Sequence, residues 1–144
     1  QNLNQHLQSM SMTNHDIISG KICWYCECPT ELVSDKEIYG PDSTYGGKYY
    51  RCLKDKDHYV GTYSDNKKSL GRVANKKLRT WKRNGHAAFD PLWKSKKRKF
   101  ISQKFAYQWL SEVMGLDISL THFGMFTEEQ CSEAINHCEI LAKD

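Results

Sequence analysis

The sequence predicts an α+β fold in which a small antiparallel β module packs against about three α-helices. Short β-prone runs separated by turn-forming residues occupy residues 21–66, and each run is too short to bury much surface alone. Apolar residues at helical spacing dominate residues 75–141. We therefore expect a flexible arm at residues 1–20, the β module at residues 21–66 and a helical part at residues 67–144, forming one compact unit.

The β module is predicted from four strand-like runs. They are "KICWYC", "ELVSDKEIYG", "KYYRC" and "HYVGTYS". The stretch "YGPDSTYGG" between the second and third runs is rich in turn-forming residues, which favours a loop there.

Three helices follow, each with a recognisable boundary. Asn75 is a candidate N-cap of the first helix, and Asp90-Pro91 should end it, because a residue before proline is disfavoured in the α region. Ser102 and Gly115 fit the start and stop of the second helix, and Thr127 with Gln130 predicts a capping box for the third. The expected core of this part is Leu78, Trp81, Phe89, Leu92, Phe105, Trp109, Leu110, Val113, Phe126 and Ile135.

The cysteines divide into two groups. Cys131 and Cys138 share the apolar stripe of the last helix, where a cysteine behaves as a small hydrophobic residue. The stretch "CWYCEC" places Cys23 and Cys26 at the spacing of a metal-binding knuckle, with Cys52 as the natural third ligand. These residues predict a structural Zn²⁺ site in a zinc-ribbon-like module.

The fourth position of this site stays open on the sequence alone. His58 supplies an imidazole, which suits zinc, Cys28 supplies a softer thiolate from an already crowded turn, and Asp55 has suitable spacing but is an unusual structural zinc ligand. The predicted ligand set is Cys23, Cys26, Cys52 and His58, with Cys28, Asp55 or a water as alternatives to His58. The opposing interpretation is that no metal binds and the cysteines only pack.

The charge of the chain is unevenly distributed. Residues 67–104 hold 14 Lys or Arg and the single acid Asp90, whereas residues 1–66 hold 6 basic and 9 acidic residues and residues 105–144 hold 1 and 7. Such a basic block predicts a surface for DNA or RNA phosphates. The candidate contacts are Lys76, Lys77, Arg79, Lys82, Arg83, His86, Lys96, Lys97, Arg98 and Lys99. Trp81 and Trp93 could stack on single strands, although packing inside the protein is the better explanation of both.

Two other functions compete with a non-catalytic nucleic-acid-binding protein. His86 and Asp90 lie one helical turn apart and, with His122, could serve a metal-dependent nuclease, but one carboxylate in the basic block is poor provision for a catalytic metal. His122 lies between apolar residues, which favours a packed histidine. The acidic C-terminal part could instead bind a basic partner protein. The sequence favours the non-catalytic alternatives.

The setting expected for the protein is a reducing compartment. Six cysteines without a secretion signal more often bind metal than form disulfides, and no apolar run is long enough to span a membrane. We therefore expect a cytoplasmic protein. Met10 or Met12 could each be the native start within the polar N-terminal stretch.

The chain resembles a family found in phages and prophages and described as a zinc-finger-containing domain. The matching stretches are "CWYC", "EIYG", "YYRC", "LGRVANKKLRTWKRNGHAAFDPLW", "AYQWLSEVMG" and "THFGMFTEEQC", in order through residues 23–131. The family usually carries two C-x-x-C pairs, so the resemblance implies Cys23, Cys26 and Cys52 as ligands. The fourth cysteine of that pattern falls at Asp55 or Lys56 here, which leaves His58 as a replacement. The resemblance implies an architecture and a phage or prophage setting, but no reaction. A phage- or prophage-encoded modulator of a host enzyme would be one example of the protein-binding alternative.

Overall fold

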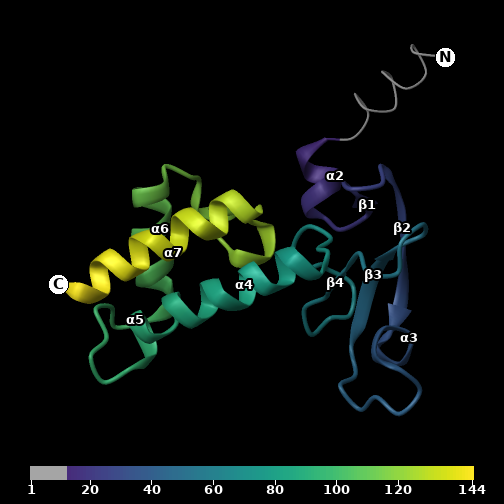
Figure 1. Ribbon diagram of the computed structural model, residues 1–144, viewed down its shortest axis with the longest axis horizontal. Coiled ribbons are helices and arrows are strands. Elements are labelled where there is room, and N and C mark those ends of the chain that lie inside the picture. The colour runs from purple at the N-terminus through teal and green to yellow at the C-terminus, as the bar shows by residue number, and fades with distance from the viewer. Residues whose placement is uncertain (1–12) are drawn as a thin grey trace. The chain divides into compact units, whose positions relative to one another are not determined.

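The computed structural model describes residues 13–144 and shows an α+β fold, which confirms the predicted class (Figure 1). The chain divides into two compact units, Gln1–Lys76 and Lys77–Asp144. Residues 1–12 of the predicted arm lie outside the described residues. Residues 13–20 contain the short helix α2 (Asn14–Ile18), which begins with a capping box between Thr13 and Asp16.

The first unit contains a four-stranded antiparallel sheet in the order of the sequence. Its strands are β1 (Ile22–Cys23), β2 (Cys28–Ser34), β3 (Lys48–Cys52) and β4 (Tyr59–Gly61). Cys23 pairs with Cys28 across β1 and β2, and Thr30 pairs with Cys52 across β2 and β3. Because side chains alternate between the faces of a strand, this register places Cys28 and Cys52 on the same face.

That face forms the core of the first unit. Cys23, Cys28, Cys52, Val60 and Val73 are buried together, with Trp24, Tyr25, Cys26 and Tyr50 packed around them. The indole N–H of Trp24 donates to the carbonyl of Val73 at 2.7 Å, which ties the knuckle to the segment that leads into the next helix. A core with so few apolar residues needs an additional cross-link to be stable.

The predicted strand "ELVSDKEIYG" is only partly correct. It continues as a strand to Ser34 and then forms the short helix α3 (Asp35–Tyr39). The carboxylate of the buried Asp35 accepts hydrogen bonds from the backbone N–H of Gly46 and the hydroxyl of Ser43, both at 2.8 Å. These bonds hold the pKa of Asp35 below its ordinary value and fix the loop after α3, an interaction that strand propensity does not reveal.

The second unit is helical. It contains α4 (Lys76–Phe89, which begins at the unit boundary), α5 (Pro91–Lys94), α6 (Gln103–Met114) and α7 (Glu128–Lys143), with 3₁₀ turns η1 (Ile118–Leu120) and η2 (Phe123–Met125) before α7. The predicted capping box of Thr127 with Gln130 is confirmed, as is the left-handed stop at Gly115. Ser102 is the N-cap of α6 by position, although its side chain makes no capping hydrogen bond.

Aromatic rings fill the core of the second unit. The ring of Phe89 lies 4.5 Å from that of Tyr107 and 5.6 Å from that of Phe123, measured between centroids, and Phe123 contacts Phe126 at 5.2 Å. Gly85 allows α4 to approach this cluster, because a Cβ on it would lie 2.2 Å from the ring of Phe123. Phe123 is therefore a central core residue, although it is absent from the core predicted from the sequence.

The predicted core is correct for most positions and wrong for two. Leu78, Phe89, Leu92, Leu110 and Phe126 are buried, and Trp81, Trp109 and Ile135 are partly buried. In contrast, Phe105 is 49% exposed and Val113 is 38% exposed. The buried face of α6 consists of Ala106, Tyr107 and Leu110. The apolar face predicted for this helix therefore differs from the buried face by a rotation of about one residue.

The end of the first predicted helix also needs a correction. Helix α4 ends at Phe89 as expected, but Asp90 stays in the right-handed α region (φ −59°, ψ −38°). Its backbone N–H donates to the carbonyl of His86, and the N–H of Lys94 donates to the carbonyl of Asp90. Pro91 is tolerated because it is the first residue of α5, where its missing N–H would have no intrahelical acceptor. Helical spacing thus continues from α4 into α5.

Within residues 13–144, none of the helices is both long and apolar enough to cross a membrane.

Candidate metal centre

The first half of the candidate site is the turn between β1 and β2. The backbone N–H of Glu27 donates to the carbonyl of Cys23 at 2.7 Å, and Glu27 adopts a left-handed conformation with φ +53°. A residue other than glycine rarely adopts this conformation, so the knuckle is a specific local structure. It presents the thiols of Cys23 and Cys26 to the same volume.

The second half lies where β3 and β4 meet. Cys52 ends β3, and its N–H donates to the carbonyl of His58 at 2.8 Å, which closes the loop between them. The backbone N–H groups of Lys54 and Asp55 point at the sulfur of Cys52, at 3.3 and 3.4 Å. This is the environment of a thiolate, because backbone donors stabilise its negative charge.

The thiol pKa values follow from burial and these donors. Burial raises the pKa of Cys23 to about 12 and raises that of Cys26 as well. Burial acts in the same direction on Cys52, but the N–H groups of Asp55 and Lys54 and the thiols of Cys28 and Cys23 together outweigh it and lower its pKa to about 6. Without a bound cation, the cluster thus favours one thiolate, and a divalent metal would stabilise the others.

One ring nitrogen of His58 faces the cysteines, and the other ring nitrogen faces Asp55. Its Nδ1 lies 3.5 Å from the sulfur of Cys23 and 3.6 Å from that of Cys26. Its Nε2 lies 3.4 Å from a carboxylate oxygen of Asp55, and its ring packs on Tyr25 with centroids 4.6 Å apart. A carboxylate behind the imidazole is the usual outer partner of a histidine that binds metal.

The four donors fit a tetrahedral zinc ion. One donor atom each from Cys23, Cys26, Cys52 and His58 lies within 4.8 Å of all the others. Tetrahedral zinc with bonds of about 2.0–2.3 Å holds its ligand atoms somewhat less than 4 Å apart. The three sulfurs and one imidazole nitrogen are the donor types that structural zinc sites use, and the cluster therefore points to zinc.

The other two candidates for the fourth position have different neighbours. The sulfur of Cys28 lies 3.4 Å from that of Cys52, on the face of β2 that covers the cluster, and it is not one of the four converging donors. Asp55 pairs with His58 instead of facing the sulfurs. The geometry therefore favours His58 as the fourth donor, with Cys28 next to the site and Asp55 behind it.

The residues predicted to contact nucleic acid differ in how accessible their side chains are. Arg79 and Lys82 are partly buried, and the ammonium of Lys82 donates to the carbonyl of Gly124 at 2.9 Å. Lys77 pairs with Glu128 at 3.4 Å. The remaining predicted contacts are exposed: Lys76, Arg83, His86, Lys96, Lys97, Arg98 and Lys99.

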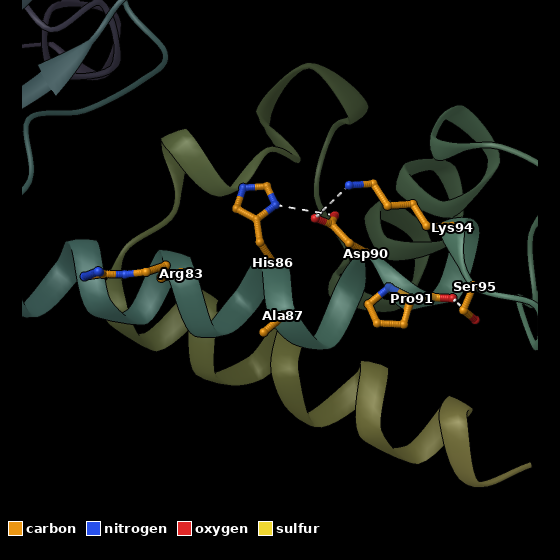
Figure 2. Close-up of a pocket in the computed structure, with 7 residues that line it drawn as sticks. All are labelled: Arg83, His86, Ala87, Asp90, Pro91, Lys94 and Ser95. Carbon is orange, nitrogen blue, oxygen red and sulfur yellow. Dashed lines mark hydrogen bonds and ion pairs between the residues drawn. The ribbon is translucent and has the colours of Figure 1, made fainter. Parts of the chain in front are cut away.

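A surface pocket along α4 and α5 was not predicted as such. It has a volume of about 510 Å³ and is lined by Arg83, His86, Ala87, Asp90, Pro91, Lys94 and Ser95 (Figure 2). The His86–Asp90 spacing suggested part of it, and the structure places Nδ1 of His86 3.5 Å from Asp90. Lys94, Ala87 and Pro91 were missed, although their four-residue spacings along a continuous helix would have indicated one face.

Two other predicted residues have mainly packing roles. Trp93 is partly buried, and its indole N–H donates to Asp90 at 3.3 Å. His122 is partly buried against the ring of Tyr107, with centroids 4.9 Å apart. Cys131 and Cys138 are buried in α7, as expected of core thiols, and burial raises the pKa of Cys138 to about 12.

Comparisons with known proteins bear on the cysteine and histidine cluster. A family model described as a zinc-finger-containing domain matches residues 19–140. That range contains all four donors and both compact units, apart from the terminal residues. No curated protein and no solved structure matched the chain.

Proposed function

Because this chain belongs to the family of zinc-finger-containing domains, we propose that it is a non-catalytic nucleic-acid-binding protein with a structural zinc site. Four protein donors fill a tetrahedral shell and leave no position for a substrate, which is the pattern of a structural site. A zinc ion there would supply a cross-link between the knuckle at Cys23 and Cys26 and the loop at Cys52 and His58. Joined in this way, the four ligand residues would hold the strands of the sheet in the register described above.

The observation that carries the proposal is the exposed basic surface of α4 and of the segment after α5. Residues 67–104 contain 14 Lys or Arg and one acid, and Arg83, Lys96, Lys97, Arg98 and Lys99 are exposed. The one acid, Asp90, is already paired with His86 and Lys94. A surface with this charge attracts phosphate backbones and gains affinity by releasing their counterions.

The test is a salt titration of binding to DNA and RNA of mixed sequence. Under the proposal, binding is detectable at low salt, and the logarithm of the affinity falls linearly with the logarithm of the salt concentration. Undetectable binding at low salt, or an affinity that does not change with salt, would show that the basic surface serves another purpose.

A protein-binding role is the second candidate, and a tyrosine surface in the first unit favours it. The ring of Tyr39 lies 4.8 Å from that of Tyr45 and 5.7 Å from that of Tyr49, and Tyr49 lies 6.3 Å from Tyr59. Tyr45 is 78% exposed and Tyr39 is 50% exposed. Tyrosines are enriched where proteins meet, because a rigid ring buries area at little entropic cost.

Under this second candidate function, the chain is a phage- or prophage-encoded modulator of a host enzyme, acting in the bacterial cytoplasm. The sequence resemblance described above supports the origin, and a cysteine cluster suited to a metal supports the compartment. A pull-down from host lysate with and without nuclease treatment separates the two candidates. Protein partners that survive nuclease treatment favour the modulator, and partners that vanish favour nucleic acid.

A metal-dependent nuclease is the least supported function. His86 and Asp90 are adjacent, but within residues 13–144 only the cysteine and histidine cluster brings three or more metal-ligating side chains together. Incubating plasmid or RNA with Mg²⁺ or Mn²⁺ tests it, with His86→Ala as the control. Cleavage that the substitution abolishes would establish the enzyme, and cleavage that it leaves unchanged would indicate a contaminant.

A further inference from the structure

The pocket on α4 and α5 has two rows of side chains with different chemistry. Arg83, Ala87 and Pro91 follow one another at four-residue intervals, and so do His86, Asp90 and Lys94. Residues four apart share a helix face, and the helical spacing runs through Asp90 into α5. The two rows therefore run along neighbouring sides of the helix, and Figure 2 shows His86, Asp90 and Lys94 above the ribbon and Ala87 and Pro91 along its lower edge.

The polar row is internally neutralised at its centre. Asp90 lies 3.5 Å from Nδ1 of His86 and 3.9 Å from the ammonium of Lys94, and it also accepts the indole N–H of Trp93. His86 and Lys94 approach the carboxylate from opposite sides (Figure 2). The ring of His86 also packs on Phe123, with centroids 4.8 Å apart. Asp90 therefore holds its neighbours in place, and it does not make the pocket negatively charged overall.

The other row has a cation at one end and an apolar floor. Arg83 extends along α4 away from Lys94, and Ala87 and Pro91 lie between them, both exposed (Figure 2). Eight residues of helix separate Arg83 from Pro91, a rise of about 12 Å. A uniformly charged surface would suit phosphates alone, whereas this pocket offers an apolar surface flanked by cations.

We propose that this pocket holds one unpaired nucleotide, with its base or sugar on Ala87 and Pro91 and other phosphates of the same strand at Arg83 and Lys94. The inference rests on the proposed function and makes it more specific. A base can reach an apolar floor only when it is not paired and stacked in a duplex, so the pocket selects single strands over double strands. The pocket volume of about 510 Å³ is in the range of small-ligand sites.

The test uses the zinc-loaded chain with a short oligo-dT and a DNA duplex of the same length. The variant Ala87→Gln covers the floor without changing the charge, and Ala142→Gln makes the same change at an exposed position of α7. We expect the unchanged chain to bind the single strand more tightly than the duplex. Ala87→Gln should weaken single-strand binding by about fivefold and leave duplex binding unchanged, because burying about 40 Å² of apolar surface under the base contributes on that order. The control should bind as the unchanged chain does.

Other outcomes separate this inference from the function on which it rests. Equal binding of both DNA forms, or an Ala87→Gln variant that weakens both or neither, overturns the pocket while salt-dependent binding still supports the proposed function. No binding of either form overturns both. Zinc content and the circular dichroism spectrum confirm that each variant is folded. If Ala87→Gln fails that check, Pro91→Ala replaces it, because alanine keeps the helix while removing the proline ring.

Discussion

The Nε2 of His58 lies 3.4 Å from a carboxylate oxygen of Asp55, on the other side of the imidazole ring from the cysteine sulfurs. This relationship distinguishes two residues that the sequence offers as rival ligands. Asp55 orients the ring, and Nδ1 of His58 faces the sulfurs of Cys23 and Cys26. A carboxylate in this position fixes the tautomer of the histidine and makes its free nitrogen a better donor to a metal.

Replacing Asp55 should therefore weaken zinc binding without abolishing it. Asp55→Asn keeps an oxygen for the backbone N–H of Asp57 but removes the charge that faces His58. We expect zinc affinity to fall by about 10- to 100-fold, with one zinc per chain still bound at saturation. Competition with a chromophoric chelator measures this, with the exposed Asp42→Asn as control. An unchanged affinity would mean that Asp55 does not support the site.

Removing zinc should unfold the first unit selectively. Its core contains few apolar residues besides the cysteines, so a metal would contribute a large part of its stability. The second unit has its own aromatic core around Phe89 and Phe123. After chelation, hydrogen exchange should accelerate in β1 to β4 and stay slow in α6 and α7. Retained protection in the sheet would contradict a structural role for the metal.

Gly85→Ala should destabilise the second unit. The added methyl group would meet the ring of Phe123 at 2.2 Å, and that ring is confined by Phe89, Phe126 and His86. We expect the free energy of unfolding to fall by about 1–3 kcal/mol, as for other overpacked cores, even though alanine is the better helix former. Urea denaturation measures the change.

The matched control for that substitution is Asn84→Ala, one residue earlier on the exposed side of α4. It should leave stability unchanged or raise it by a few tenths of a kcal/mol, because only helix propensity changes. Equal effects at both positions would show that the approach of α4 to Phe123 is not as close as described.

Two exposed lysines should each account for about one phosphate contact. Changing Lys96 and Lys99 to Gln together should lower the slope of log affinity against log salt by about 1.4–1.8, depending on whether the strand is single or double. Lys48 and Lys54, which are exposed in the first unit, form the control pair. Slopes that fall equally in the two double variants would place the contact surface elsewhere.

Local signals in the sequence predict the elements well. The pairing of Thr127 with Gln130 marks the start of α7, and Gly115 marks the end of α6, because both depend on neighbours in the chain. The run "KYYRC" matches β3, because its aromatic residues favour a strand. Helix α3 was missed because the hydrogen bonds that Asp35 accepts come from Ser43 and Gly46, beyond the reach of a propensity argument.

Relationships over longer range could not be predicted. Tyr107, not Phe105, is buried in α6, because Tyr107 stacks on Phe89, and the sequence pattern alone does not fix the rotation of a helix. Likewise, the spacing of Cys28, Asp55 and His58 leaves the fourth donor open. The structure favours His58, because its ring nitrogen converges with the sulfurs of Cys23, Cys26 and Cys52, whereas the register of β2 on β3 places Cys28 beside Cys52.

The most direct test of this account is metal analysis of the purified chain and two variants, Cys28→Ser and His58→Ala. We expect one zinc per chain in the unchanged protein and in Cys28→Ser, and weakened or lost zinc in His58→Ala. Full zinc in His58→Ala together with its loss in Cys28→Ser would contradict the assignment and make Cys28 the fourth ligand.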